Sequence, residues 1–349
     1  MGMDEEKALK ALSPKRVWLS VAIGLAVVVF VAARDKNLTK ESFYLMAEVS
    51  ISAIIIVLLV LAVKDALNTT RIKVLGEGAF SWKSALFIVL LWEFSTAVTP
   101  PLFGPMGLVI FVLYKEGVSL GKAFAYAMLL AFLDNLFFLT AAPLAYFLSA
   151  GTVLPSSEGS LNELGSGIDY FFYLSYGLVA YYTCFIAAAI LFFPKLILRM
   201  MLRIASLKWM KRGSLVLSNR ANELYAASQE FRGKHIGYWL KLLGLTYSVW
   251  VMKYLVINVL VSGFVALTLE QHFLMVGRHL VLWLVMLVSP TPGSAGTAEY
   301  LFPAFFGEFL GDYTFAGGLI WRLLSFYPYL IIGALILPRW IKRVLAKSA

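Results

Sequence analysis

The chain is dominated by apolar runs of about 20 residues, the length that a helix needs to cross a bilayer. In hydrocarbon no water satisfies the backbone N–H and C=O groups, so each run must pair its own backbone as a helix. We therefore expect an all-α polytopic membrane protein with six full spans. The unbroken runs are 17–33, 43–63, 122–148, 169–193, 239–267 and 313–337.

The composition agrees with this fold class. The 349 residues are 60% hydrophobic and 14% charged, whereas soluble domains are about 45–50% apolar and about 25% charged. The net charge of +10 comes from basic residues in loops between apolar runs, so we expect no nucleic-acid partner. The single cysteine, Cys184, and three scattered histidines lack metal-ligand spacing, and no cofactor is expected.

Two further apolar segments, 84–113 and 279–307, are interrupted by prolines and glycines. Such interruptions at membrane depth persist only where protein or a wet cavity satisfies the backbone. Paired interruptions in the two halves of a membrane protein indicate a transport site. We expect these residues mainly to shape the backbone, although freed amides near the second break suit a phosphate oxygen. The residues are Thr99, Pro100 and Gly104 in the first break and Pro290, Pro292, Gly293 and Gly296 in the second.

The distribution of Lys and Arg predicts the orientation. Segment 194–236 holds nine basic residues, whereas 149–168 and 307–313 hold none. We place the first in the cytoplasm and the other two outside. These loop positions are consistent with one another if segment 84–113 enters the membrane from the cytoplasm and returns there. Segment 279–307 would likewise enter from outside and return outside. Both termini are predicted to be cytoplasmic, in the inner membrane of a prokaryote.

This arrangement divides the chain into two membrane repeats, 1–148 and 149–349. Each repeat would contain three full crossings and one broken re-entrant hairpin, so the second repeat is inverted relative to the first. An inverted-topology repeat brings one hairpin from each face toward the midplane. The alternative is eight plain helices, two of which are kinked by proline.

Five ionisable residues fall at predicted membrane depth: Glu93, Asp134, Lys253, Glu299 and Arg322. Insertion of such a residue costs on the order of 2.5–3.5 kcal/mol, so each is a candidate for a function. An acid lies at each break and a further charge on the helix that follows it, which predicts one shared polar cavity. The planar guanidinium of Arg322 suits a phosphodiester.

Structural roles remain open for the same residues. Glu299 is also placed to cap a half-helix, where the helix dipole favours an anion, and Glu93 has a similar alternative. Arg322 has the alternative of an ion pair with Glu299 or Asp134. Asp134 is equally suited to a buried hydrogen bond between helices, and the long side chain of Lys253 to snorkelling along a cavity wall.

Three motifs resemble the membrane domain of lysylphosphatidylglycerol synthase/flippase proteins and their stand-alone homologues. They are Thr99-Pro100 with Gly104 and the following 114–119, then Pro290-x-Pro292-Gly293-x-x-Gly296-x-x-Glu299, and finally 322–328. The resemblance implies lipid translocation between leaflets, with aminoacyl transfer performed by a separate soluble domain. The chain departs from the family pattern at Val109 and Ala298, where arginines are frequent.

We therefore expect a lipid translocator rather than an enzyme, because no nucleophile–base pair or metal cluster is evident at membrane depth. Its partners would be membrane lipids, either an anionic or aminoacylated phospholipid or a lipid-linked intermediate. Three alternatives remain: an ion- or proton-coupled carrier of a small solute, a non-catalytic partner subunit of a lipid-modifying enzyme, and an intramembrane transferase. A homo-oligomer is compatible with the sequence.

Overall fold

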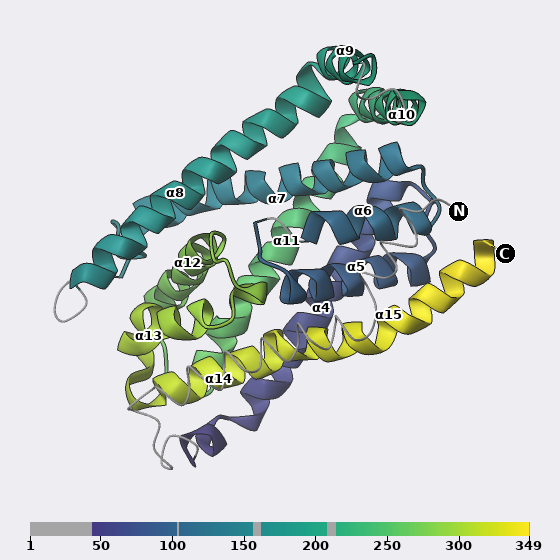
Figure 1. The fold of residues 1–349 in the computed structure, drawn as a ribbon. Helices are drawn as coiled ribbons and strands as arrows, with labels where there is room; N and C mark the ends of the chain where they lie inside the picture. Colours follow the sequence, from purple (N-terminus) through teal and green to yellow (C-terminus); the bar gives the residue numbers. More distant parts are fainter. Residues whose placement is uncertain (1–43, 103–104, 156–161, 208–213, 349) are drawn as a thin grey trace.

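The computed structural model describes residues 44–102, 105–155, 162–207 and 214–348, and all the regular secondary structure within them is helical. For residues 162–166 and 345–348 it describes the backbone alone. Figure 1 shows long helices running obliquely between the two ends of the molecule. The predicted span 17–33 and the break residue Gly104 lie outside the described residues.

Five helical stretches are long and apolar enough to cross a membrane, which confirms the all-α polytopic class. They match five of the six predicted spans; helix α8 continues into a π-helical segment, Ala187–Phe192. The stretches are α4 (Ile51–Gly76), α7 (Leu120–Leu148), α8 (Asn162–Ile186) with its π extension, α11 (Ile236–Val261) and the C-terminal stretch Thr297–Val344.

Helix α4 lies further along the chain than the predicted span 43–63. The hydropathy pattern ends at Lys64, but the helix continues to Gly76. Lys64 and Arg71 are each only 2% exposed, so they lie inside the helical bundle and not in a cytoplasmic loop. Their charges are paired with carboxylates in the interior, and this pairing allows the helix to continue past them.

The segment 84–113 forms two helices, α5 (Trp82–Val98) and α6 (Pro105–Lys115). Thr99 is extended, at φ −129° and ψ 154°, as expected for a residue before proline. Pro105 opens α6, a position where its missing N–H is tolerated. In Figure 1 the two helices lie side by side and the break connects them near the middle of the molecule.

The second interrupted segment lies between α12 (Leu269–Met286) and α13 (Thr297–Leu310), with a short 3-10 turn, Pro292–Ser294, in the break. Gly293 has φ +56° and Gly296 φ +83°. Residues with a side chain rarely adopt such positive φ angles, so glycine is favoured at both positions. Whether both segments are re-entrant parts of an inverted repeat remains a prediction.

The predicted span 313–337 is divided into α14 (Thr314–Ser325) and α15 (Tyr327–Ser348). The division falls at Phe326, whose φ and ψ are −115° and −58°. Pro328 has no N–H to donate to the preceding turn, so the helix is interrupted there. Short 3-10 turns, Met46–Glu48 and Gly311–Tyr313, complete this part of the chain.

The buried apolar residues form two separate cores, one around each interrupted segment. The long helices pass through both. Helix α7 contributes Leu133 to the core around α5–α6 and Phe137 to the core around α12–α13. It therefore passes from one core to the other near Asp134. Helix α14 contributes Trp321 to the second core, while Phe326 belongs to the first, so Arg322 lies near that transition. The polar residues therefore gather between the cores.

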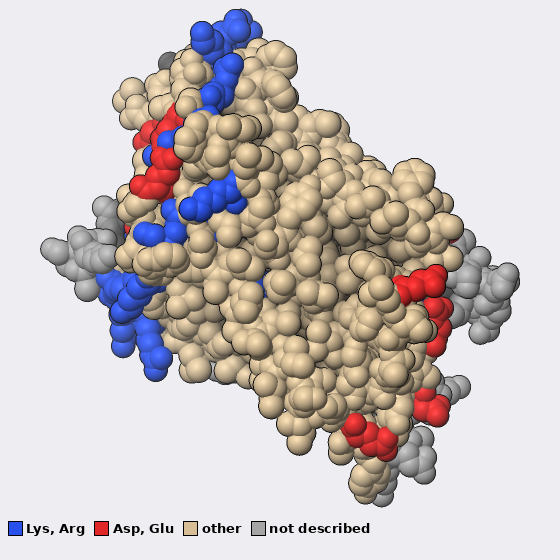
Figure 2. Space-filling view, turned by 180° about the vertical axis from the view of Figure 1, so that it is seen from behind, with Lys and Arg blue, Asp and Glu red and all other residues tan. Residues whose placement is uncertain are grey.

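Helices α9 (Pro194–Ala205) and α10 (Ser214–Arg232) lie at one end of the molecule. Helix α10 is fixed to the start of α7: Glu223 accepts a hydrogen bond from the Gly121 amide at 2.8 Å, and Glu230 pairs with Lys122 at 2.8 Å. Figure 2 shows most of the visible basic residues at one end and acidic residues without basic neighbours at the other, with an uncharged band between.

Candidate functional site: a polar cavity between the two breaks

A cavity of about 370 Å³ lies between the two cores. Its wall is formed by residues from both breaks and from the helices that cross the bundle. Four of the five predicted site residues line it, and Glu299 is not among the lining residues. The charged lining residues are Lys64, Arg71, Glu93, Asp134, Lys253 and Arg322.

The two breaks touch at the wall of this cavity. The Gly293 amide donates a hydrogen bond to the carbonyl oxygen of Thr99 at 3.1 Å. A Cβ atom on Gly293 would lie 2.8 Å from the Ala97 carbonyl oxygen and 2.2 Å from the Phe326 ring. Only a residue without a side chain permits this approach, which gives Gly293 a structural role in addition to its place in the cavity lining.

Arg322 and Glu299 form an ion pair that holds the second break. One carboxylate oxygen of Glu299 accepts from the Gly296 amide at 2.6 Å, and the other accepts from Arg322 Nε at 2.8 Å. Arg322 Nη2 also donates to the Gly293 carbonyl at 3.2 Å. The guanidinium lies 3.8 Å from the centroid of the Phe326 ring. The capping and ion-pair alternatives for Glu299 and Arg322 are thus both present in the geometry.

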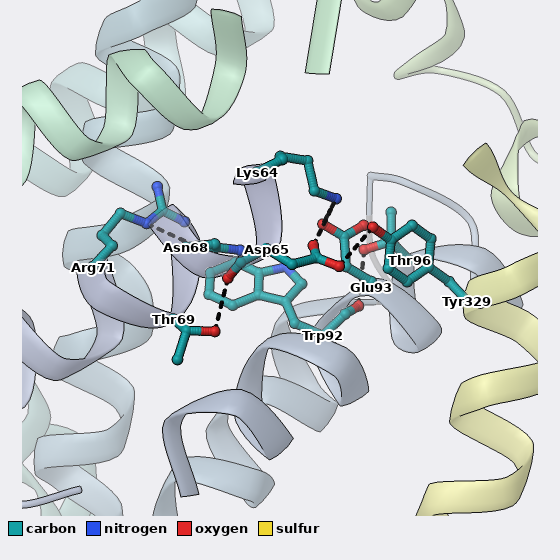
Figure 3. A network of polar contacts seen from close by, with 9 residues as sticks. All are labelled: Lys64, Asp65, Asn68, Thr69, Arg71, Trp92, Glu93, Thr96 and Tyr329. Atoms are coloured by element: carbon teal, nitrogen blue, oxygen red, sulfur yellow. Dashed lines mark hydrogen bonds and ion pairs between the residues drawn. The ribbon is translucent and has the colours of Figure 1, made fainter. Parts of the chain in front are cut away.

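Glu93 belongs to a network that includes residues missed by the sequence interpretation (Figure 3). The Lys64 ammonium lies 2.7 Å from Glu93 and 3.2 Å from Asp65, which neighbours it on α4. The Tyr329 hydroxyl donates to Asp65 Oδ2 at 2.9 Å, and its ring lies 4.5 Å from the ammonium. The network connects α4, α5 and α15.

Asp134 is partly buried and contacts a guanidinium and an indole. Its Oδ1 accepts from Arg71 Nη1 at 2.5 Å and from Trp250 Nε1 at 2.9 Å. Arg71 also donates to Asn68 on its own helix. This arrangement is the inter-helix hydrogen bond that was the alternative for Asp134, although the carboxylate still lines the cavity.

Lys253 differs from the other cavity cations. Within the described residues no carboxylate pairs with its ammonium, which lies 4.6 Å from the Trp250 ring centroid and 5.7 Å from that of Trp283. Glu93 lies within electrostatic range but is paired with Lys64. The described lining residues include four cations and two acids. The other three lining cations, Lys64, Arg71 and Arg322, are each paired with a carboxylate, so Lys253 is the lining cation available to a ligand.

The remaining break residues lie mostly outside the cavity lining. Pro101 and Pro105 line the cavity beside Gly293, whereas Thr99, Pro100, Pro290, Pro292 and Gly296 are not among its lining residues. The Thr99 hydroxyl donates to the Ser95 carbonyl at 2.5 Å. That most of these residues shape the backbone remains a prediction.

Sequence reasoning missed Lys64, Arg71 and Tyr329 as cavity residues. A signal was present in the first two: Lys64, Asn68 and Arg71 are spaced by four and three residues, which places them on one face of a helix. Read with the apolar residues before it, this pattern predicts a longer helix with a polar stripe. Tyr329 carried no comparable signal.

The fold and the cavity define a polytopic helical membrane protein with an internal polar site. The sequence model of one protein family, the lysylphosphatidylglycerol synthase TM region, matches residues 17–333, and the chain belongs to that family. The match confirms the resemblance found in the motifs and connects the chain with membrane lipids. No individually curated protein and no solved structure matches the chain.

Proposed function

We propose that the protein translocates a lipid with an anionic phosphate head group, which enters the cavity between the two breaks. The observation that carries this proposal is the Lys253 ammonium, which lines the cavity and has no carboxylate partner among the described residues. A zwitterionic or anionic head group crosses hydrocarbon at a large free-energy cost, and fixed charges along the route lower that cost.

Cavity size supports a head group rather than a whole lipid. Ligand pockets measure about 300–1,000 Å³, and the cavity lies at the lower end with about 370 Å³. The phosphate would contact Lys253 and the guanidinium hydrogens of Arg322 that are not used by Glu299 and Gly293. The acyl chains would stay in the surrounding hydrocarbon.

The same proposal includes the orientation and the inverted repeat. The basic end, with α9 and α10, would face the cytoplasm of a prokaryote, as the positive-inside rule favours. The two broken segments would enter from opposite faces and meet at the hydrogen bond between Gly293 and Thr99. Alternate opening on either side of that contact would expose the cavity to one leaflet and then to the other. The protein itself would perform no covalent chemistry.

The test is lipid movement in proteoliposomes containing the purified full chain. Head-group-labelled phosphatidylglycerol, lysylphosphatidylglycerol and phosphatidylcholine are compared, and outer-leaflet label is quenched from outside. We expect the anionic lipid to move fastest, and K253Q to reduce its rate about tenfold or more, as for loss of a charged hydrogen bond of about 1.5–3 kcal/mol. K195Q, which removes the same charge on exposed α9 outside the cavity, is the control. The proposal would be contradicted if the three lipids moved at equal rates and if K253Q moved them as fast as K195Q.

A further inference from the structure

Two carboxylates share one ammonium beside the cavity. Lys64 is 2% exposed and lies between Glu93 at 2.7 Å and Asp65 at 3.2 Å. Glu93 and Lys64 line the cavity, while Asp65 is not among its lining residues and contacts Tyr329. The three charged groups together carry one negative charge in excess, and the two acid side chains are largely buried.

The two acids are not equivalent. Glu93 accepts a well-aligned hydrogen bond from Lys64. Asp65 Oδ2 accepts from the Tyr329 hydroxyl, but the buried Oδ1 receives no hydrogen bond. Its contact with the ammonium at 3.2 Å is therefore electrostatic, without the alignment of a hydrogen bond. Asp65 Oδ1 is thus the oxygen in this network best placed to accept a proton.

Lys253 balances the excess charge while the cavity is empty. It lies within electrostatic range of both Glu93 and Lys64, so Lys64, Lys253, Asp65 and Glu93 together are neutral. An anion bound at Lys253 removes this balance and leaves one negative charge in a largely buried site. A buried net charge is unfavourable, and uptake of a proton restores neutrality.

We propose that binding of an anionic head group at Lys253 is coupled to uptake of a proton by the Asp65 carboxylate. A hydronium ion in the surrounding solution gives up the proton: one of its O–H bonds breaks as an O–H bond forms at Asp65 Oδ1, a water molecule is released, and no other covalent bond changes. This inference rests on the proposed function and adds an energy source, because a proton gradient would then drive the lipid. By reciprocity, the anion affinity rises as pH falls.

Several charged groups face this network from the helices packed around it. Helix α4 supplies Lys64 and, further along the same helix, Arg71, which is paired with Asp134. Helix α5 supplies Glu93, α11 supplies Lys253 and α15 supplies the Tyr329 hydroxyl. Of these, Asp65 is the group whose neutralisation breaks no hydrogen-bonded ion pair, since Glu93 and Asp134 each accept a direct hydrogen bond from their cation.

The experiment uses the full chain in detergent with dihexanoyl phosphatidylglycerol as the anionic probe. Calorimetric titrations in two buffers of different ionisation enthalpy give the protons taken up per probe bound. We expect about one proton in the wild type and a probe affinity that rises about tenfold per pH unit on acidification across the titration range. D65N should bind without proton uptake, at all pH values, with the affinity of the wild type at low pH. D312N, at an exposed position outside the cavity, should behave as the wild type.

The outcomes separate the two proposals. Binding of the probe without proton uptake in the wild type would overturn the coupling and leave the head-group site in place. Loss of binding in folded D65N would assign Asp65 a positioning role and also overturn the coupling. Absence of binding in the wild type, with dihexanoyl phosphatidylcholine equally inert, would overturn both. E93Q is the second variant: it leaves one positive charge in excess, so the probe should bind without proton uptake, and uptake equal to that of the wild type would overturn the charge balance.

Discussion

The amide nitrogen of Gly293 lies 3.1 Å from the carbonyl oxygen of Thr99, so two interruptions that are far apart in the sequence share a backbone hydrogen bond. Each break leaves backbone groups without a helical partner. Here one break satisfies a group of the other, as the scarcity of water at membrane depth requires. The contact also forms part of the cavity wall, since Gly293 is a lining residue. Folding and site formation therefore depend on the same few atoms.

Replacement of Gly293 tests this contact. A Cβ atom there would lie 2.2 Å from the Phe326 ring and 2.8 Å from the Ala97 carbonyl, at a φ of +56°. We expect G293A to lower the free energy of unfolding by about 1–3 kcal/mol and to abolish lipid movement. Thermal unfolding in detergent measures the first effect. G244A, on α11 with nothing within 4 Å of the added atom, is the control; equal stability of the two variants would contradict the contact.

Replacement of Arg322 by lysine preserves the charge but not the geometry. Arg322 bonds Glu299 through Nε and the Gly293 carbonyl through Nη2 at the same time. An ammonium lacks the planar fork that makes both bonds. We expect R322K to lose about 1.5–3 kcal/mol of stability, measured by thermal unfolding. The reverse exchange at an exposed position of α15, K342R, is the control and should leave stability unchanged. A melting temperature of R322K equal to that of the wild type would show that the fork is dispensable.

The Arg71–Asp134 pair should couple strongly in a double-mutant cycle. Arg71 is 2% exposed and bonds Asp134 at 2.5 Å. Removal of one partner leaves a buried unpaired charge, which costs about 3–5 kcal/mol. We expect R71M and D134N each to be destabilised in this range, and the double variant to be less destabilised than the sum. Additive effects in chemical or thermal unfolding would mean that the two charges do not stabilise one another.

The attachment of α10 should weaken in acid. Partial burial tends to raise the pKa of Glu230, but its hydrogen bond and ion pairs with Lys122 and Lys234 prevail and hold the pKa below the usual 4.5. A carboxyl whose pKa is lower in the folded state stabilises that state above the unfolded pKa. The contribution is therefore complete above about pH 4.5 and is lost as pH falls through the lowered pKa.

Hydrogen exchange of the α10 amides measures this effect. The protection of these amides, measured relative to the intrinsic exchange rate at each pH, should fall below the usual carboxyl pKa in the wild type. E230Q should show lower protection at neutral pH and a weaker dependence on acid. Glu308, which pairs with Arg278 elsewhere in the molecule, provides E308Q as the control. Identical exchange of α10 at neutral pH in E230Q and the wild type would contradict the attachment.

The sequence alone predicted the helical class and the two interruptions because both follow from local chemistry: apolar length and the backbone properties of Pro and Gly. It placed the end of the second span at Lys64 because a hydropathy pattern treats every charge as a boundary. The partner that keeps Lys64 inside, Glu93, lies 29 positions away. For the same reason the pairing of Asp134 with Arg71 was invisible, whereas the pair of Glu299 and Arg322 was one of two alternatives. Pairing between distant helices is a tertiary property.

The close contact between Gly333 and Phe94 attaches the C-terminal helix α15 to α5. A Cβ atom on Gly333 would lie 2.2 Å from the Phe94 ring, so α15 lies in close contact with α5, and the Trp340 indole further attaches it to Glu116 at 2.6 Å. Helix α14 instead packs against α13 and carries the Arg322 that holds the second break. The C-terminal chain therefore contacts the second interrupted segment before Phe326, through α14, and the first interrupted segment after it, through α15. A movement that separates the two interrupted segments would have to bend the chain at Phe326, where Pro328 supplies no N–H to the preceding turn.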